Sequence, residues 1–268
     1  MVRYQTLFCF ATLLILLPVG TARGELIVHR GISFWIYRVD PKDMSVELHL
    51  ADKQGEPNTF PKLKERIEQD ERRIKFAMNA GIFEGNFLPT GLHVSEGKQV
   101  TPINSKDFVK QWEGQFTDNF FLKPNGVFCI LSSGTAAILE TEAYRQSNFS
   151  SPVHLATQSG PLLVENGKIH PVLTENSTSI RYRNGVGITT DGMIVFACSL
   201  LEGDKGESNL YQFAELFRNT LKCSNALYLD GDISYIFIEG ETPPIQESNF
   251  FAGILAVTEP MTEPNPKP

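Results

Sequence analysis

The stretch Asn225-Ala-Leu-Tyr-Leu-Asp-Gly-Asp-Ile-Ser234 decides the fold, because an apolar run of strand length ends inside it at Asp230. A second strand-like run, Met193–Leu200, precedes it, and Asn209–Leu221 between them carries apolar residues at helical spacing. Strand, helix and strand over this length predict a crossover unit at 193–230, with two parallel strands and a helix packed on the sheet.

The end of the last strand is also where we expect a functional site, because ligands tend to bind at the carboxyl ends of strands in crossover units. Asp230 and Asp232 lie there, on either side of Gly231. For the helix, Ser208 is the expected N-cap.

Glycine interrupts the chain after or before other strand-like runs too. Glycines let the backbone turn sharply and approach a ligand closely. Each such break is ordinary turn chemistry when taken alone, but together they place amide, hydroxyl and guanidinium groups at strand ends. The three further breaks are Asn79-Ala-Gly-Ile-Phe83, Gln158-Ser-Gly-Pro161 and Arg183-Asn-Gly-Val-Gly187.

With their flanking residues, these breaks resemble the phosphodiester glycosidase domain family, to which the lysosomal uncovering enzyme N-acetylglucosamine-1-phosphodiester α-N-acetylglucosaminidase belongs. The similar segments occur in the family's order and cover roughly residues 45–258. The departure is Asp232, where the family usually has Gly or Ser. The segments are Phe76-Ala-Met-Asn-Ala-Gly-Ile-Phe83, Pro89-Thr-Gly-Leu92, Asn119-Phe-Phe-Leu-Lys-Pro-Asn-Gly-Val-Phe128, Ala156-Thr-Gln-Ser-Gly-Pro-Leu-Leu163, Arg183-Asn-Gly-Val-Gly187 and Asn225–Ser234.

The resemblance implies a hydrolase that cleaves a glycosyl-1-phosphodiester, a sugar-phosphate diester bond. Glycosidases commonly use two carboxylates around an oxocarbenium-like centre. Asp230 is the expected reacting carboxylate, as nucleophile, general base or holder of sugar hydroxyls. Asp232 is either its partner or a loop-capping residue. His170, which matches a family position, is either a general acid or a turn cap.

The phosphate is expected to meet an arginine, because a guanidinium binds phosphate oxygens in bidentate fashion. Arg183 matches the family segment, and Arg181 is the competitor, spaced to share one face of a strand with it.

The remaining expected substrate-binding residues are amides, hydroxyls and glycines at the same breaks. Asn79 and Gln158 would hydrogen-bond sugar hydroxyls or orient a water. Backbone N–H groups at the glycines would line an anion-binding nest. Ser159 is not in a nucleophile elbow, and Ser234 is expected to hydrogen-bond near Asp230. The glycines of this expected site are Gly81, Gly160, Gly185 and Gly231.

Two other functions fit the same residues. In a metal-dependent phosphodiesterase, Asp230, Asp232 and a histidine would hold an ion and the P–O bond would break. A noncatalytic envelope-glycan binding protein would keep the pocket without turnover. No cofactor is certain. A divalent cation such as calcium is an alternative, although residues 233–235 lack the remaining ligands of a calcium loop.

The charge balance argues against nucleic-acid partners. The formal net charge is −7, and without the first 24 residues, which hold Arg3 and Arg23 and no acid, 22 basic and 31 acidic residues remain, giving −9. An acidic chain without aromatic-basic interleaving is a poor nucleic-acid binder. The expected partner is a small molecule or glycan that carries a sugar phosphodiester.

Residues 1–24 have the pattern of a signal peptide: Arg3 as positive flank, the short apolar run Leu7–Pro18, and small residues for cleavage. The run is too short for a confident membrane span, although an uncleaved anchor is the alternative. The sequence therefore predicts a periplasmic or secreted protein with no stable membrane span after cleavage.

We expect one domain at 25–258 and a disordered, Pro- and Glu-rich tail at 259–268. The fold class is α+β, a strand-rich mixed sheet with a few helices. A helix is predicted at Phe60–Glu71 and a hairpin at Gly126–Leu139. Three cysteines follow the signal, Cys129, Cys198 and Cys223, and a disulfide between the last two stays open.

Overall fold

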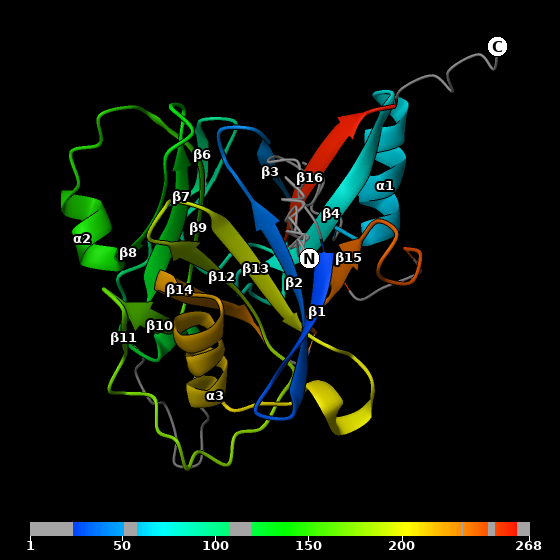
Figure 1. The fold of residues 1–268 in the computed structure, drawn as a ribbon. Helices are drawn as coiled ribbons and strands as arrows, with labels where there is room; N and C mark the ends of the chain where they lie inside the picture. Colours follow the sequence, from blue (N-terminus) through cyan, green and yellow to red (C-terminus); the bar gives the residue numbers. More distant parts are fainter. Residues whose placement is uncertain (1–23, 51–57, 108–118, 232, 246–249, 262–268) are drawn as a thin grey trace, which may run out of the picture.

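A computed structural model describes residues 24–50, 58–107, 119–231, 233–245 and 250–261 (Figure 1). The largest of its three sheets has seven strands in the order β1-β2-β13-β12-β14-β10-β11. These strands are β1 (Gly24–His29), β2 (Ile32–Val39), β13 (Ile194–Ser199), β12 (Asn184–Thr189), β14 (Cys223–Asp230), β10 (Leu162–Glu165) and β11 (Lys168–Ile169).

Two smaller sheets complete the strand framework. The four-stranded sheet has the order β15 (Ile236–Ile238), β4 (Arg72–Ala80), β16 (Gly253–Pro260), β3 (Val46–Leu50). The five-stranded sheet has the order β6 (Lys98–Thr101), β5 (His93–Ser95), β9 (Val153–Ser159), β7 (Gly126–Leu131), β8 (Ala136–Glu140). The hairpin predicted at 126–139 is β7 and β8.

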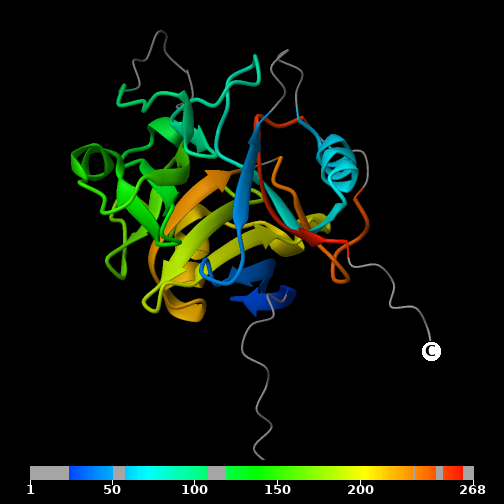
Figure 2. The same ribbon diagram turned by 90° about the horizontal axis from the view of Figure 1, so that it is seen from above.

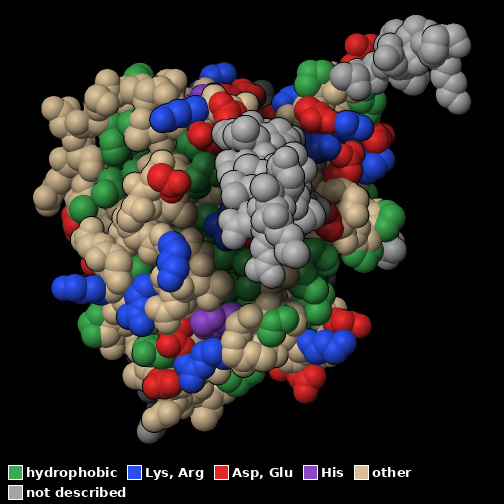
Figure 3. All heavy atoms as spheres, viewed as in Figure 1, with side chains coloured by type: hydrophobic (Ala, Val, Ile, Leu, Met, Phe, Trp, Pro, Cys, Tyr) green, Lys and Arg blue, Asp and Glu red, His purple; other side chains and the backbone are tan. Residues whose placement is uncertain are grey.

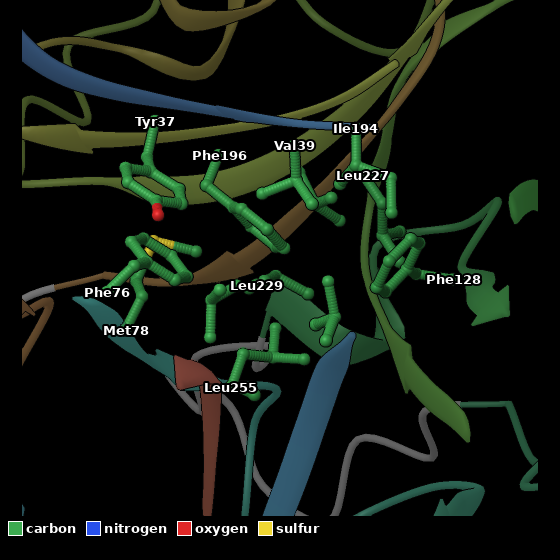
Figure 4. Packing of buried hydrophobic residues seen from close by; sticks show 14 of the residues in the cluster. Tyr37, Val39, Phe76, Met78, Phe128, Ile194, Phe196, Leu227, Leu229 and Leu255 are labelled. Atoms are coloured by element: carbon green, nitrogen blue, oxygen red, sulfur yellow. The ribbon is translucent and has the colours of Figure 1, made fainter. Parts of the chain in front are cut away.

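One apolar core lies where the three sheets face one another. Tyr37 stacks on Phe76 with ring centroids 4.5 Å apart, and Phe76 stacks on Phe196 at 4.7 Å, so rings from two sheets interdigitate (Figure 4). Leu229 and Leu255 close the same cluster. The strand that ends at Asp230 is thus fixed by packing on its inner face.

Helices cover the outer faces. Helix α1 (Phe60–Gln69) buries its apolar side on the four-stranded sheet, while α2 (Thr141–Gln146) lies beside the five-stranded one, at the opposite side of the molecule (Figure 2). Helix α3 (Leu210–Glu215), continued by a π-helical turn at Leu216–Thr220, covers the seven-stranded sheet. Short 3-10 turns occur at Asn119–Phe121 and Gly203–Gly206.

The 193–230 segment shows how the sheets differ from the expected mixed arrangement. Strands β13 and β14 both run antiparallel to β12 and lie on its two sides, with α3 between them in the chain. They are therefore parallel to each other without being neighbours. All strand pairs of the described residues are antiparallel. The two parallel strands β13 and β14 do not pair, because β12 lies between them. The strand-rich α+β class is confirmed.

Local details also differ from expectation. Asn209, not Ser208, is the N-cap of α3, because its side chain accepts from the Gln212 N–H in a capping box. Strand β16 continues to Pro260, past the expected start of the tail. The three cysteines Cys129, Cys198 and Cys223 are buried thiols, so Cys198 and Cys223 form no disulfide.

Two surface properties bear on partners. Acidic and basic side chains are interspersed on the face seen in Figure 3. Within the described residues, no helix is both long enough and apolar enough to cross a membrane. Of the predicted signal segment 1–24, residues 1–23 lie outside the described residues, and Gly24 begins β1.

Candidate active site

The four glycine-bearing breaks meet at the carboxyl end of β14. Asp230 is the last residue of that strand and lies opposite Asn184 of β12. Its Oδ2 accepts a hydrogen bond of 2.7 Å from Asn79 Nδ2, at the end of β4. Its Oδ1 accepts one of 2.7 Å from the backbone N–H of Gly231. Asn79, which lies 151 positions before Asp230 in the chain, thus helps to fix this carboxylate.

Asn79 is held so that its amide nitrogen can only face the carboxylate. The side chain is 1% exposed, and its Oδ1 accepts from Asn184 Nδ2 at 2.7 Å and from the Tyr235 backbone N–H at 2.8 Å. Two donors at the oxygen leave Nδ2 to donate to Asp230. Asn184 Oδ1 is itself buried with no partner among the described residues.

Arg183 lies at the start of the neighbouring strand with its guanidinium buried, 1% exposed. Its Nε donates to the Ser208 carbonyl (3.1 Å) and its Nη2 to the Ser179 carbonyl (2.7 Å). Its Nη1 donates to the Tyr228 hydroxyl (3.2 Å), and its Cζ lies 5.4 Å from the centre of that ring. It forms no ion pair with an acidic residue in the part of the chain that the structure describes.

Tyr228 accepts a hydrogen bond from the guanidinium and lies two residues before Asp230 in β14. Its ring is 1% exposed, and its hydroxyl also accepts from Asn119 Nδ2 at 3.3 Å. Burial raises the pKa of this phenol to about 12, with Arg183 opposing the rise and the charge of Asp230 adding to it. The opposed charges of Asp230 and Arg183 therefore act on one hydroxyl.

Glycine is required at two positions of the site. Gly81 has φ +68°, and a Cβ there would lie 2.8 Å from Thr157 Oγ1. A Cβ at Gly231 would lie 2.6 Å from the Tyr228 hydroxyl, closer than packing allows. The Asp-Gly pair thus keeps a side chain out of the space in front of Tyr228.

Several of the expected site residues hold the backbone of the site. Ser159 Oγ donates to the Leu229 carbonyl (3.0 Å), and Ser234 Oγ donates to the Asp230 carbonyl (3.3 Å). Gly160 and Gly185 permit close packing: an added Cβ would lie 2.7 Å from Asn125 Cβ at the first and 2.8 Å from the Leu227 carbonyl at the second.

Gln158 supports a loop and has no amide group left for a substrate. Its Oε1 accepts from the N–H groups of Leu92 and Asn104, and its Nε2 donates to the Asn104 carbonyl and Thr141 Oγ1. These four bonds use both donors and both lone pairs of the side chain. In this structure the side chain therefore holds the loop, and its contact with a sugar hydroxyl stays a prediction.

Arg181 and His170 were also expected in the site, and both make contacts with backbone groups. Arg181 is exposed, and its Nη1 donates to the Ile180 carbonyl (2.9 Å), whereas Arg183 is buried. His170 follows the edge strand β11, two strands away from β14, and its Nδ1 accepts from the Val172 N–H. That is the turn-capping alternative. Asp232 lies outside the described residues.

Sequence reasoning did not select Asn184, Tyr228 or Asn119. Asn184 lies inside the quoted Arg183–Gly187 segment, so its position in a break was a usable signal. Tyr228 reads as one more residue of an apolar strand, and Asn119 is 109 positions from it in sequence. Only the folded chain brings these two together.

In the described part of the chain, no group of three or more His, Cys, Asp or Glu side chains is arranged to hold a metal ion. Because Asp232 is not described, the metal site expected from Asp230 and Asp232 stays a prediction.

Comparisons with known proteins show the family of this chain. Residues 72–249 match the model of the phosphodiester glycosidase family. The chain is also 33% identical over 215 residues to the uncharacterized protein YigE of Escherichia coli (strain K12), covering 80% of this chain and 78% of that protein. The chain therefore belongs to the phosphodiester glycosidase family.

Solved structures agree at the level of the fold. The catalytic domain of zebrafish N-acetylglucosamine-1-phosphodiester alpha-N-acetylglucosaminidase, auto-inhibited by its pro-peptide, matches with a TM-score of 0.65 and 16% identity, covering 91% of this chain and 84% of that one. A hypothetical protein from Synechocystis matches with a TM-score of 0.51 and 15% identity, covering 88% and 61%. At these identities the likeness shows a shared fold.

Proposed function

We propose that this protein hydrolyses a glycosyl-1-phosphodiester by breaking the bond between the anomeric carbon and the phosphate oxygen. Membership of the phosphodiester glycosidase family supports the reaction class. One observation carries the assignment to this site: a fixed carboxylate and a buried arginine without an acidic partner in the described residues flank the same strand end. A substrate whose carbon becomes positive while its phosphate becomes more negative suits that pair of charges.

Asp230 is the group that acts at the anomeric carbon. The C1–O bond breaks, its electron pair stays on the departing phosphomonoester, and a water oxygen bonds to C1 while its proton passes to the Asp230 carboxylate. Asn79 Nδ2 and the Gly231 N–H each donate to one oxygen of the Asp230 carboxylate, and these two bonds fix its orientation in this proposal. Asn79 positions the carboxylate for this step.

Arg183 supplies positive charge on the phosphate side. Its three hydrogen bonds go to neutral acceptors, two carbonyls and a phenol, so its charge is not cancelled by a neighbouring acid of the described chain. Such a buried cation stabilises the developing negative charge more than an exposed one does, because the local dielectric is low.

The test is hydrolysis of a panel of sugar-1-(methyl phosphate) diesters, starting with N-acetylglucosamine, in ¹⁸O-water. We expect label in the sugar and not in the phosphate. We expect Asp230→Asn to lower kcat by about 10²-fold or more while the circular dichroism spectrum stays that of the wild type. Asp70→Asn, at the exposed end of α1, is the matched control. Label in the phosphate, or full turnover by Asp230→Asn, would contradict the proposal.

We further propose that the protein acts outside the cytoplasm on an envelope glycan or a scavenged phosphosugar. The basic flank and apolar run of residues 1–24 support export. Amino-terminal sequencing of the protein recovered from fractionated cells tests this, and an intact Met1 in the cytoplasmic fraction would contradict it.

A further inference from the structure

We propose that the protein has a second binding site, for a single sugar unit, in a cavity at the end of the five-stranded sheet that lies away from Asp230. The cavity has a volume of about 350 Å³, which is within the range of small-molecule sites in proteins. Its walls are the turn before β3 and the turn between β7 and β8, and His154 of β9 completes it. The proposal goes beyond the proposed reaction, because this cavity takes no part in bond cleavage.

The cavity and the candidate active site lie at opposite ends of β7 and β9. Ser159, whose hydroxyl donates to the Leu229 carbonyl of β14, pairs with Gly126 at one end. Leu131, which lines the cavity, pairs with Val153 at the other end. Gly126 and Leu131 are five positions apart in β7, which corresponds to about 17 Å of strand. A ligand in the cavity is therefore separate from the reacting carboxylate.

The two turns that form the walls are held in place by backbone contacts. Asp40 fixes the first turn, because its Oδ1 accepts from the Lys42 N–H (2.9 Å) and its carbonyl accepts from the Asp43 N–H (3.1 Å). The turns meet at Gly134, which has φ +82° and at which a Cβ would lie 3.2 Å from the Pro41 carbonyl oxygen. Glycine there lets the two turns approach each other. The walls are thus set by the fold, so that a ligand does not have to order them.

The lining of the cavity combines buried apolar side chains with polar side chains at its mouth. Three of the apolar ones are almost fully buried: Val46, Ile130 and Leu131. The polar ones are exposed or half-buried and include both donors and acceptors of hydrogen bonds: Lys42, Asp43, Ser45, Ser132 and His154. In the part of the chain that the structure describes, none of these five side chains has a hydrogen-bond or ion-pair partner, so all five are available to a ligand.

These groups suit a neutral molecule with several hydroxyls. The formal charges of Lys42 and Asp43 cancel, so the cavity favours neither an anion nor a cation. A sugar hydroxyl both donates and accepts, and it can therefore bond the carboxylate of Asp43 as well as the ammonium and hydroxyl groups beside it. The C–H face of a sugar ring is apolar and suits the buried side chains below. The chemistry of the lining thus points to a sugar as the ligand.

The test is a titration of the protein with a panel of methyl glycosides, starting with methyl N-acetylglucosaminide, followed by nuclear magnetic resonance. The backbone amides of residues 42–45 and 132–134 report binding in the cavity and not elsewhere. We expect these amides to shift with at least one glycoside of the panel. The same shifts should occur in Asp230→Asn, because the cavity is separate from the candidate active site.

Two variants act on the cavity in different ways. Asp43→Ala removes a charged acceptor that has no partner in the described chain, and Ser132→Trp fills the cavity with a large side chain. Each should raise the Kd for the glycoside at least about 10-fold. Ser133→Trp is the matched control, because Ser133 belongs to the same turn but does not line the cavity, and its Kd should equal that of wild type.

The proposal is overturned if no glycoside of the panel shifts the amides of the cavity in wild type. It is also overturned if wild type, Asp43→Ala and Ser132→Trp bind the glycoside with the same Kd. The titration does not depend on catalysis. If a glycoside binds in the cavity but the protein cleaves no phosphodiester, the second site stands and the proposed function fails.

Discussion

At the scale of single residues, Asn79 is the side chain whose orientation matters most. Its oxygen takes two donors, so its nitrogen must face Asp230. Removing one positioned donor from a reacting group commonly costs about 10²-fold in rate, and we expect Asn79→Ala to lower kcat by that order. Asn166→Ala, in an exposed turn, is the control. A kcat within twofold of wild type would show that Asn79 does not position the carboxylate.

Asn79→Asp tests the same contact by charge. It places a second carboxyl group where Nδ2 now lies 2.7 Å from Asp230. Two carboxylates at that distance cannot both ionise, so one must hold a proton. The form that keeps a hydrogen bond to an ionised Asp230 holds this proton on residue 79, and the proton is lost as the pH rises. We therefore expect the activity that remains to shift to lower pH, which the pH profile of kcat measures. A profile superimposable on that of wild type would contradict this.

Replacing Tyr37 is expected to change the stability of the fold and not the activity of the site. Its hydroxyl is buried in the core with no partner among the described residues, and its ring stacks on Phe76 (Figure 4). A buried hydroxyl without a hydrogen-bond partner destabilises the folded state, because it has lost its hydrogen bonds to water. We therefore expect Tyr37→Phe to raise the free energy of unfolding by about 1 kcal/mol. Urea unfolding at pH 7.5 measures it, and a loss of stability would reveal a missed partner.

At the scale of elements, the start of α3 supports Arg183. Asn209 Oδ1 caps the helix by accepting from the Gln212 N–H, and its Nδ2 donates to the carbonyls of Glu175 and Ser177. It thereby fastens to the helix the loop that carries Ser179, whose carbonyl holds the guanidinium. The cap serves both the helix and the site.

We therefore expect Asn209→Ala to cost about 2 kcal/mol of stability, at the upper end for a cap, and to lower kcat/KM as well. Gln212→Ala removes the other half of the capping box and leaves the loop contacts in place. The Gln212→Ala variant should lose less stability than Asn209→Ala and keep a kcat/KM near that of wild type. Equal effects of the two on kcat/KM would exclude a role for the loop.

Element prediction succeeded where a single periodicity decides the structure. The strands that lead to Asn79 and Asp230 were predictable because an apolar run stops at a polar residue. Helix α1 was predictable because Phe60, Leu63 and Ile67 recur at helical spacing and Pro61 suits a first helical turn. Sheet order was not readable, because nothing local says that β12 separates β13 from β14. The loop contacts of Gln158 were not predictable for the same reason, because its partners at 92, 104 and 141 are distant in sequence.

At the scale of the whole molecule, the three sheets enclose a histidine as well as the apolar core. His93 of β5 is 1% exposed, and its Nε2 has no partner in the described chain. Its Cε1 lies 3.5 Å from the Cβ position of Gly253 in β16, so the ring is packed between the five-stranded and four-stranded sheets. Charging it would put a cation between two sheets.

Burial accordingly lowers the pKa of His93 to about 4, from an ordinary value near 6.5. Well above pH 6.5 the ring is neutral in both the folded and the unfolded chain, so the histidine does not lower the free energy of unfolding there. Between pH 6.5 and 4 the unfolded chain binds a proton that the folded chain does not, so stability falls as pH falls. The pKa of Glu47 is lowered to about 2, so this residue reduces the free energy of unfolding only as the pH falls below its ordinary value near 4.5.

The window from pH 7.5 to 5.0 therefore isolates histidine from the carboxyl groups. Over it, His93 should lower the free energy of unfolding of wild type by about 2 kcal/mol. We expect His93→Gln to lose that part of the pH dependence in urea unfolding, whatever its own stability at pH 7.5. His170→Gln, at the surface turn after β11, should keep it. If His93→Gln retained the full dependence on pH, another group would cause it, and His29, whose pKa burial also lowers, would be the next residue to replace.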